Sequence, residues 1–364
     1  AHASLIAGQG GLAMAKLMGS EMPKGIEDRF WETNKALLFF GEHTFGAAES
    51  ISSPYSQTTM EQREIKESYA WEANRRAKTI NEEALGLLID HTGSDQAPSL
   101  VVFNTLTWDR DGMVTLYIDH EQIPIGSEMQ LVADDGSVIP AQIAQPWHGG
   151  SYWSAWVNDI PSFGFKKYRI EVLENEHGHS HGSDSHVHNT GLSGYSEKGD
   201  IIQIENQWYN LTIDKKKAAI RQIKDKEIGQ NLLDEGSEYQ LGEFILEKLG
   251  GREQLQSSME PNGSRYGHLT DYTREPLDSI WLSQIEEGKL WTSVVFKGKT
   301  GTAYEKEGFE FELKLFKVSK RIDFVFNLKK KPITSPESFY IAFPFHLDKA
   351  KIHAEIAGGV MQAG

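Results

Sequence analysis

Five histidines lie close together near the middle of the chain and form its densest set of potential metal ligands. They are His177, His179, His181, His186 and His188, and they are separated by glycine, serine and aspartate and by one valine, Val187. Imidazoles at alternate positions can bind zinc, copper or nickel. A specific metal site also requires a rigid backbone and partners that hold each ring, which a loop of this composition does not supply. The composition therefore favours a solvated loop, with a histidine-rich metal buffer as an alternative.

A second candidate lies at the end of a helical pattern. Glu42 and His43 are flanked by Gly41 on one side and by Gly46 on the other. An acid and an imidazole in this setting suit metal ligation or proton transfer. A buried histidine hydrogen-bonded to a carbonyl would give the same pattern. The residues alone leave both interpretations open.

Three tryptophans form an aromatic cluster around a pair of glycines. They are Trp147, Trp153 and Trp156. Tryptophan rings can stack on sugar rings, and their polar edges remain free for hydroxyl groups. Residues three apart in a strand face opposite sides, so one of Trp153 and Trp156 is expected in a core. A non-catalytic carbohydrate-binding sandwich that uses these residues is one functional hypothesis.

The composition excludes several classes of protein. The 364 residues include 37 Lys and Arg against 52 Asp and Glu, which gives a net charge of −15. Such a surface repels nucleic acids and anionic membranes, so we expect neither as a partner. No cysteine is present, which excludes disulfides, thiol catalysis and thiolate zinc sites. The sequence also lacks a phosphate-binding glycine loop, a nucleophile elbow and a His-Glu-x-x-His motif.

The predicted secondary structure that positions these residues changes from helices to strands near residue 97. Apolar residues recur every three or four positions from Ile26 to Leu38 and from Ile65 to Leu88, which predicts helices within 22–95. Thr58 and Glu61 have the spacing of a capping box at the start of the second helix.

From Ser99 onward the apolar period becomes two, as in Phe309, Phe311, Leu313 and Leu315. That alternation is typical of antiparallel sheets with one buried face. We therefore expect an α+β multidomain chain, in which an N-terminal antiparallel helical bundle precedes one or two antiparallel β-sandwich domains.

The expected domain boundaries follow these changes of pattern. The chain starts without methionine at Ala1 and stops after a short Gly- and Ala-containing stretch, so we expect a piece of a longer protein. The expected parts are the tail of a preceding domain (1–24), a helical bundle (25–96), a small β-sandwich (97–175), an exposed histidine-rich loop or linker (176–199) and a large, truncated β-sandwich (200–364).

Three segments, in order along the chain, resemble glycoside hydrolase family 38, the α-mannosidases. Val101–Arg110 (VVFNTLTWDR) is similar to the strand that opens the family's C-terminal β region. Ile160–Tyr168 (IPSFGFKKY) is similar to its P-x-x-G-Y-x-x-Y segment. Ile204–Asp214, continuing to Ile223–Gly229, is similar to a third family segment. The resemblance covers about residues 25–235, and it implies the family's architecture of a catalytic α/β barrel, a three-helix bundle and β domains.

The resemblance implies a retaining α-mannosidase-like glycosidase acting on α-linked mannosides or related oligosaccharides. Two carboxylates would act as nucleophile and acid, and both would lie in a barrel upstream of Ala1. No catalytic residue is therefore assigned in this chain, and the chain alone is expected to be inactive. The alternative remains a non-catalytic carbohydrate-binding protein.

The resemblance implies one metal ligand in this chain. In the family, a histidine near the start of the bundle, commonly followed by aspartate, completes a zinc site shared with the barrel. His43 matches it in place and order, whereas Thr44 stands where the aspartate is common. Zinc would bind and polarise sugar hydroxyl groups. Glu42 and Thr44 are then candidates for residues that support the ligand.

Overall fold

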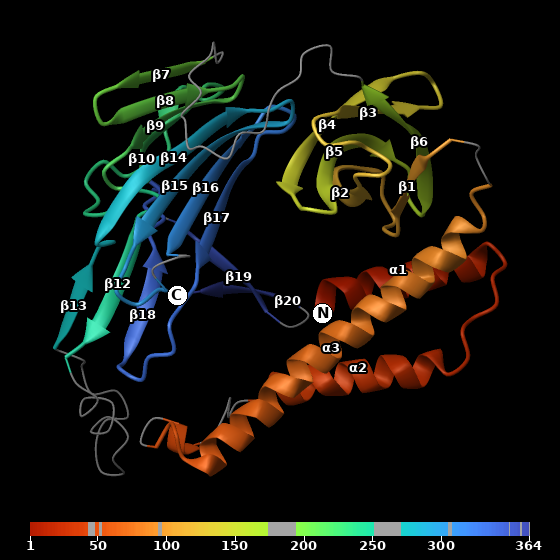
Figure 1. The fold of residues 1–364 in the computed structure, drawn as a ribbon, viewed down its shortest axis with the longest axis horizontal. Coiled ribbons are helices and arrows are strands. Elements are labelled where there is room, and N and C mark those ends of the chain that lie inside the picture. Colours follow the sequence, from red (N-terminus) through yellow and green to blue (C-terminus); the bar gives the residue numbers. More distant parts are fainter. Residues whose placement is uncertain are drawn as a thin grey trace. The chain divides into compact units, whose positions relative to one another are not determined.

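The chain divides into two compact units. The computed structural model describes residues 1–42, 48–50, 53–93, 97–173, 194–250, 271–304, 308–348, 350–356 and 359–363. The first unit is Ala1–His181 and the second is Gly182–Gly364. Figure 1 shows the helices and strands β1 to β6 in the first unit, and strands from β7 onward in the second. Each unit has a hydrophobic core of its own.

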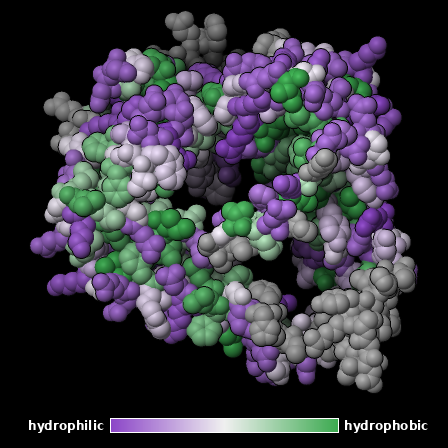
Figure 2. Space-filling model, turned by 180° about the vertical axis from the view of Figure 1, so that it is seen from behind, coloured by the Kyte–Doolittle hydropathy of each residue, from purple (hydrophilic) through white to green (hydrophobic). Residues whose placement is uncertain are grey.

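The surface is largely polar. Figure 2 shows hydrophilic residues over much of one face, with hydrophobic patches between them. This agrees with the high content of charged residues, 24% of the sequence. Within the described ranges, no helix is long and apolar enough to cross a membrane.

The first unit begins with the helices expected from the apolar period of 3.6. The helical elements are α1 (His2–Leu17), α2 (Ile26–Phe40), the 3-10 turn η1 (Ala48–Ser50) and α3 (Gln57–Ile89). Helix α3 begins slightly earlier than the capping-box pattern predicted. Its N-cap is Ser56, whose Oγ accepts a hydrogen bond from the Thr59 backbone N–H. The predicted cap at Thr58 is therefore wrong, because Thr58 already lies inside the helix.

Helix α1 packs along α3 through glycines. A Cβ on Gly8 would lie 3.0 Å from Ile80, and one on Gly11 would lie 3.0 Å from Ala84. The order of these contacts shows that α1 and α3 run in parallel. Residues 1–24 were expected to be the tail of a preceding domain, and in the structure they contain this helix, which shares a core with α3.

Helix α2 runs antiparallel to α3, as expected for a bundle. Near its start, the Arg29 guanidinium lies 2.5 Å from the Glu83 carboxylate, and near its end Phe39 contacts Lys66. The described helices therefore combine one parallel and one antiparallel pair.

A six-stranded antiparallel sheet completes the first unit. Its order is β1-β6-β3-β4-β5-β2. The turn between β3 and β4 contains Asp134-Asp135-Gly136, and Gly136 takes the positive φ of 82° that such a turn favours. The strands are β1 (Ser99–Asn104), β2 (Arg110–Asp119), β3 (Glu128–Ala133), β4 (Val138–Pro146), β5 (Gly150–Ile160) and β6 (Gly164–Leu173).

This sheet curves around one core and also contacts the helices. Ile118 on β2, Met129 on β3 and Tyr168 on β6 belong to the same buried cluster. A smaller cluster joins Leu88 of α3 to Phe103 and Phe165 on the adjacent strands β1 and β6. The helices and the small β domain are therefore one packed unit.

The second unit consists of antiparallel strands, as the alternating pattern predicted. They form sheets in the orders β11-β10-β9-β8-β7, β13-β12-β18, β14-β15-β16-β17 and β19-β20. The strands are β7 (Tyr195–Lys198), β8 (Ile201–Glu205), β9 (Tyr209–Asp214), β10 (Ala219–Asp225), β11 (Gln230–Asn231), β12 (Phe244–Leu249), β13 (Tyr272–Glu275), β14 (Ser279–Glu287), β15 (Trp291–Lys299), β16 (Phe309–Phe316), β17 (Ile322–Leu328), β18 (Glu337–Ile341), β19 (Ile352–Ile356) and β20 (Gly359–Ala363).

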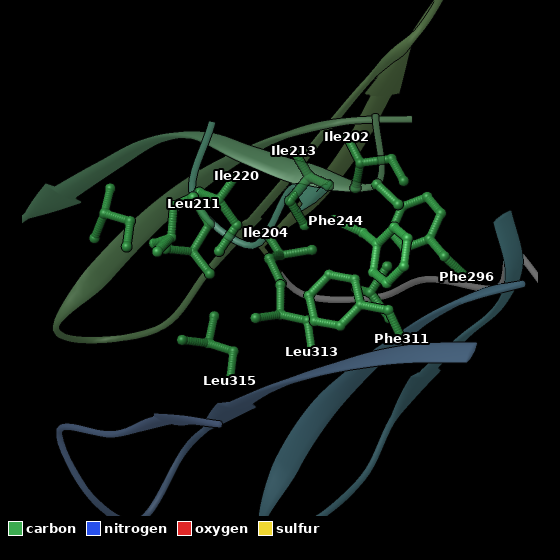
Figure 3. Packing of buried hydrophobic residues seen from close by; sticks show 14 of the residues in the cluster. Ile202, Ile204, Leu211, Ile213, Ile220, Phe244, Phe296, Phe311, Leu313 and Leu315 are labelled. Atoms are coloured by element: carbon green, nitrogen blue, oxygen red, sulfur yellow. The ribbon is translucent and has the colours of Figure 1, made fainter. Parts of the chain in front are cut away.

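Two of these sheets face each other across the core of the second unit. Figure 3 shows Ile202, Ile204 and Ile213 pointing from one sheet toward Phe311 and Leu313 of the other. All five side chains are 2% exposed or less. This packing of inward-facing alternate residues defines a β-sandwich, and it confirms the expected fold class of helices followed by antiparallel β domains.

Candidate functional site

The residue with the strongest functional prediction lies outside the described residues. His43 and Thr44 fall between 42 and 48, and the five histidines from His177 to His188 fall between 173 and 194. Glu42 is the last described residue before His43. The structure therefore describes the elements that lead to this candidate site.

A buried lysine holds the end of α2. Lys66 extends from α3, is 9% exposed, and donates hydrogen bonds to the Phe39 backbone oxygen at 2.6 Å and to Glu42 Oε2 at 3.0 Å. A cation beside the last carbonyls of a helix is stabilised by the negative end of the helix dipole. Lys66 thus fixes the backbone and the carboxylate that directly precede His43.

An aromatic contact supports the same junction. The rings of Phe39 on α2 and Tyr69 on α3 are stacked, with centroids 5.3 Å apart. Lys66 and Tyr69 are three residues apart on α3, so they lie on one face of that helix. The Glu42 carboxylate is thereby directed toward α3, where Lys66 neutralises its charge.

The described residues do not form a metal site by themselves. No group of three or more histidine, aspartate or glutamate side chains in that part of the chain is placed to hold one metal ion. Zinc sites use three or four protein ligands. The zinc expectation for His43 therefore stays a prediction that requires ligands from outside the described residues.

The role of Lys66 gives a first testable prediction. Lys66→Met keeps the apolar stem but removes both hydrogen bonds, so we expect the free energy of unfolding to fall by about 1–3 kcal/mol. Amide exchange in the last turn of α2 should become faster. Lys78→Met on the exposed side of the same helix is the matched control and should change neither quantity. Equal effects of the two substitutions would rule out a specific role for Lys66.

The three tryptophans occupy different environments. Trp153 is 4% exposed and belongs to the core of the small β domain, whereas Trp147 is 53% exposed. Trp156 is half-buried, and its Nε1 donates to the Asn158 side chain at 2.8 Å. The expectation that one member of the pair Trp153 and Trp156 is a core residue is confirmed.

The sequence interpretation missed a tyrosine pair on the small β domain. Tyr117 on β2 lies opposite Tyr152 on β5, and their ring centroids are 5.2 Å apart. Both are about two-fifths exposed, at 41% and 40%. Partial desolvation and the nearby Asp119 raise the pKa of the Tyr117 hydroxyl. Only the cross-strand register reveals this pair, because the two residues lie far apart in the sequence.

The second unit contains two adjoining cavities that no sequence motif indicated. Their volumes are about 590 Å³ and 510 Å³, and both are lined in part by Lys217, Glu238 and Tyr239. Volumes of roughly 300–1,000 Å³ are usual for small-molecule sites.

Comparisons with known proteins identify the fold. No protein-family model matches the chain, and no curated protein matches its sequence. Two solved structures from Enterococcus faecalis do match. One is an α-mannosidase from strain V583, with a TM-score of 0.58, 14% identity, and coverage of 97% of this chain and 43% of that chain. The other is a protein in glycosyl hydrolase family 38, with a TM-score of 0.59, 14% identity, and coverage of 97% and 44%.

The chain has the fold of part of a family 38 glycoside hydrolase. It spans less than half the length of each of these two proteins. The architecture implied by the sequence resemblance is thereby confirmed for helices followed by antiparallel β domains. The activity of a longer protein does not follow from this likeness, because it concerns the fold.

Proposed function

We propose that the chain is part of a retaining α-mannosidase-like glycoside hydrolase and supplies its helical and β domains. The observation that carries this proposal is the match of 97% of the chain to less than half of two larger proteins, one of them an α-mannosidase. The three resembling segments support it independently, because they are sequence patterns and not features of the fold. The proposed substrates are α-linked mannosides or related oligosaccharides.

The helices provide further support. Several of their large apolar side chains are exposed, including Trp31 at 60%, Leu38 at 76% and Leu17 at 78%. Groups of exposed apolar residues commonly mark surfaces that another protein part covers. In the proposed enzyme a catalytic domain would cover some of them.

In this proposal the chain's own residues position the substrate-binding machinery. Retaining hydrolysis needs one carboxylate as nucleophile and one carboxylic acid as proton donor, and both would come from the catalytic domain. His43 is the proposed zinc ligand from this chain. Lys66 would support it by holding the helix end and Glu42 directly before it.

The activity can be tested with an aryl α-mannoside. The complete protein should hydrolyse it, and proton NMR should show that the first sugar product keeps the α configuration. The 364-residue chain by itself should be inactive, because it lacks the proposed carboxylates. Hydrolysis by this chain alone, or inversion by the complete protein, would contradict the proposal.

The metal ligand requires a separate measurement. In the complete protein, His43→Ala should lower both zinc content and turnover at least about tenfold, since even residues that only support a metal ligand have effects of that size. His148→Ala is a suitable control, because His148 is exposed on the small β domain. Unchanged zinc content and turnover in His43→Ala would remove the assignment.

A second candidate function is carbohydrate binding without catalysis. The exposure of Trp147, and of the Tyr117–Tyr152 pair on the same β domain, favours it, because these rings offer apolar faces with polar edges. Affinity of the 364-residue chain for mannan that is lost in Trp147→Ala would support this function. Affinity that does not change would count against it.

A further inference from the structure

The larger cavity of the second unit, of about 590 Å³, lies on the outer side of the sheet that contains β8, β9 and β10. Figure 3 shows Ile202, Ile213 and Ile220 of these strands directed into the core. Alternate residues of a strand point to opposite faces, so their neighbours point outward. The segment from Leu233 to Gln240 forms another wall of this cavity.

Three polar side chains on neighbouring strands form a row across the floor of this cavity. Gln203 on β8 lies opposite Thr212 on β9, and Thr212 lies opposite Gln222 on β10. All three line the cavity. The row places a hydroxyl between two amides, and such groups both donate and accept hydrogen bonds.

An irregularity in β10 adds a cation to this row. The register of β9 and β10 shifts between Ile220 and Gln222, so Arg221 is the extra residue of a β-bulge. Arg221 and Gln222 are both exposed, and both line the cavity. Arg221 makes no ion pair or side-chain hydrogen bond with any residue in the described ranges. Bulges commonly redirect a side chain beside a functional site.

An ion pair between the exposed Lys217 and the buried Glu243 supports the end of the cavity that borders its neighbour. Lys217 Nζ lies 3.0 Å from each carboxylate oxygen of Glu243, which is 8% exposed and also accepts the Gln240 backbone N–H at 2.9 Å. The next residue, Ala218, has a φ of 46°, a left-handed conformation that is uncommon for residues other than glycine. Lys217 is thereby held in the wall that the two cavities share.

The charges of the lining indicate the class of ligand. Lys217 and Arg221 are cationic, and Asp234, Glu235 and Glu238 are anionic. Neither sign dominates, so the lining does not favour a simple anion or a metal ion. Each sugar hydroxyl donates one hydrogen bond and accepts others, so it matches a lining in which donors and acceptors alternate.

We propose that this cavity binds a saccharide unit through Arg221 and the Gln203–Thr212–Gln222 row. The adjoining cavity of about 510 Å³, beyond Lys217 and Tyr239, would accommodate a second sugar residue of the same oligosaccharide. The choice of a mannoside as ligand rests on the proposed function.

The test is a titration of the 364-residue chain with methyl α-D-mannopyranoside, followed by amide NMR. Shifts should concentrate on β8, β9 and β10. Arg221→Ala and Thr212→Val should each weaken binding, the arginine by about tenfold or more because its hydrogen bonds are charged. Lys224→Ala is the matched control, because Lys224 is an exposed cation on the same strand but does not line the cavity. The affinity of this variant for the sugar should equal that of the unsubstituted chain.

Three results would overturn the inference: no binding at millimolar sugar, shifts confined to other strands, or equal weakening by Lys224→Ala. Hydrolysis is measured separately, so the two proposals can fail independently. If sugar binding depends on Arg221 but the complete protein does not cleave mannosides, the proposed function is rejected and the saccharide site is retained. Cleavage without such binding would reject the site alone.

Discussion

Replacing Trp153 with alanine is expected to destabilise the first unit by about 3–5 kcal/mol, the usual range for removing a large buried aromatic side chain. Trp153 is 4% exposed and belongs to the core cluster that also contains Ile118, Met129 and Tyr168. Alanine would leave a cavity that a curved sheet closes only in part. Urea unfolding and amide exchange on β2 and β5 would measure the loss.

Trp147→Ala is the matched control for this prediction. Trp147 lies close to Trp153 in sequence but is 53% exposed, so its loss should change the free energy of unfolding by about 0.5 kcal/mol or less. Similar destabilisation by both substitutions would contradict the assignment of Trp153 to the core. The contrast also matters for function, because a carbohydrate-binding assay with Trp153→Ala would report unfolding in place of lost sugar contacts.

Phe311→Ala is expected to have an effect of similar size in the second unit, about 3–5 kcal/mol. Phe311 is 1% exposed and lies between the two facing sheets (Figure 3). Its ring stacks on Phe326 at a centroid distance of 4.5 Å and lies 5.9 Å from Phe324. The substitution removes these contacts and the buried area together, and amide exchange on β15 and β16 should report it.

Phe343→Ala provides the comparison for Phe311→Ala. Phe343 is 53% exposed and contacts Phe324 edge-on at 5.9 Å. Because much of its surface already faces water, we expect a loss of about 1 kcal/mol or less. If the exposed phenylalanine proved as costly to remove as the buried one, the sandwich core would not lie where the structure has it.

The parts of the fold that follow from periodicity could be predicted from the sequence. Phe309, Phe311, Leu313 and Leu315 alternate with charged residues, and β16 buries all four. The helix α1 is different. Its inward face combines Leu5 and Leu12 with Gly8 and Gly11, and the glycines, which permit close helix packing, interrupt the apolar stripe.

The candidate sites could be predicted from the sequence to a smaller extent than the fold. His43 could be selected because its sequence surroundings resemble a known family, and it remains a prediction. The saccharide cavity could not be found in this way, since Gln203, Thr212 and Gln222 meet only through strand register. The bulge at Arg221 interrupts the alternation, because two polar residues lie between Ile220 and Ile223. The partner strand is still needed to identify this interruption as a bulge.

The strand order of the first unit also constrains the time at which this unit can finish folding. Strands β3 and β4 are joined by a tight turn and can pair as soon as both exist, whereas β1 must wait for β6, since Ser99 pairs with Arg169. Translation proceeds at about 5–20 residues per second, so β1 leaves the ribosome on the order of seconds before its partner. Until then, Leu88 lacks its contact with Phe165. The helices are therefore made first, but their docking onto the sheet is completed among the last steps.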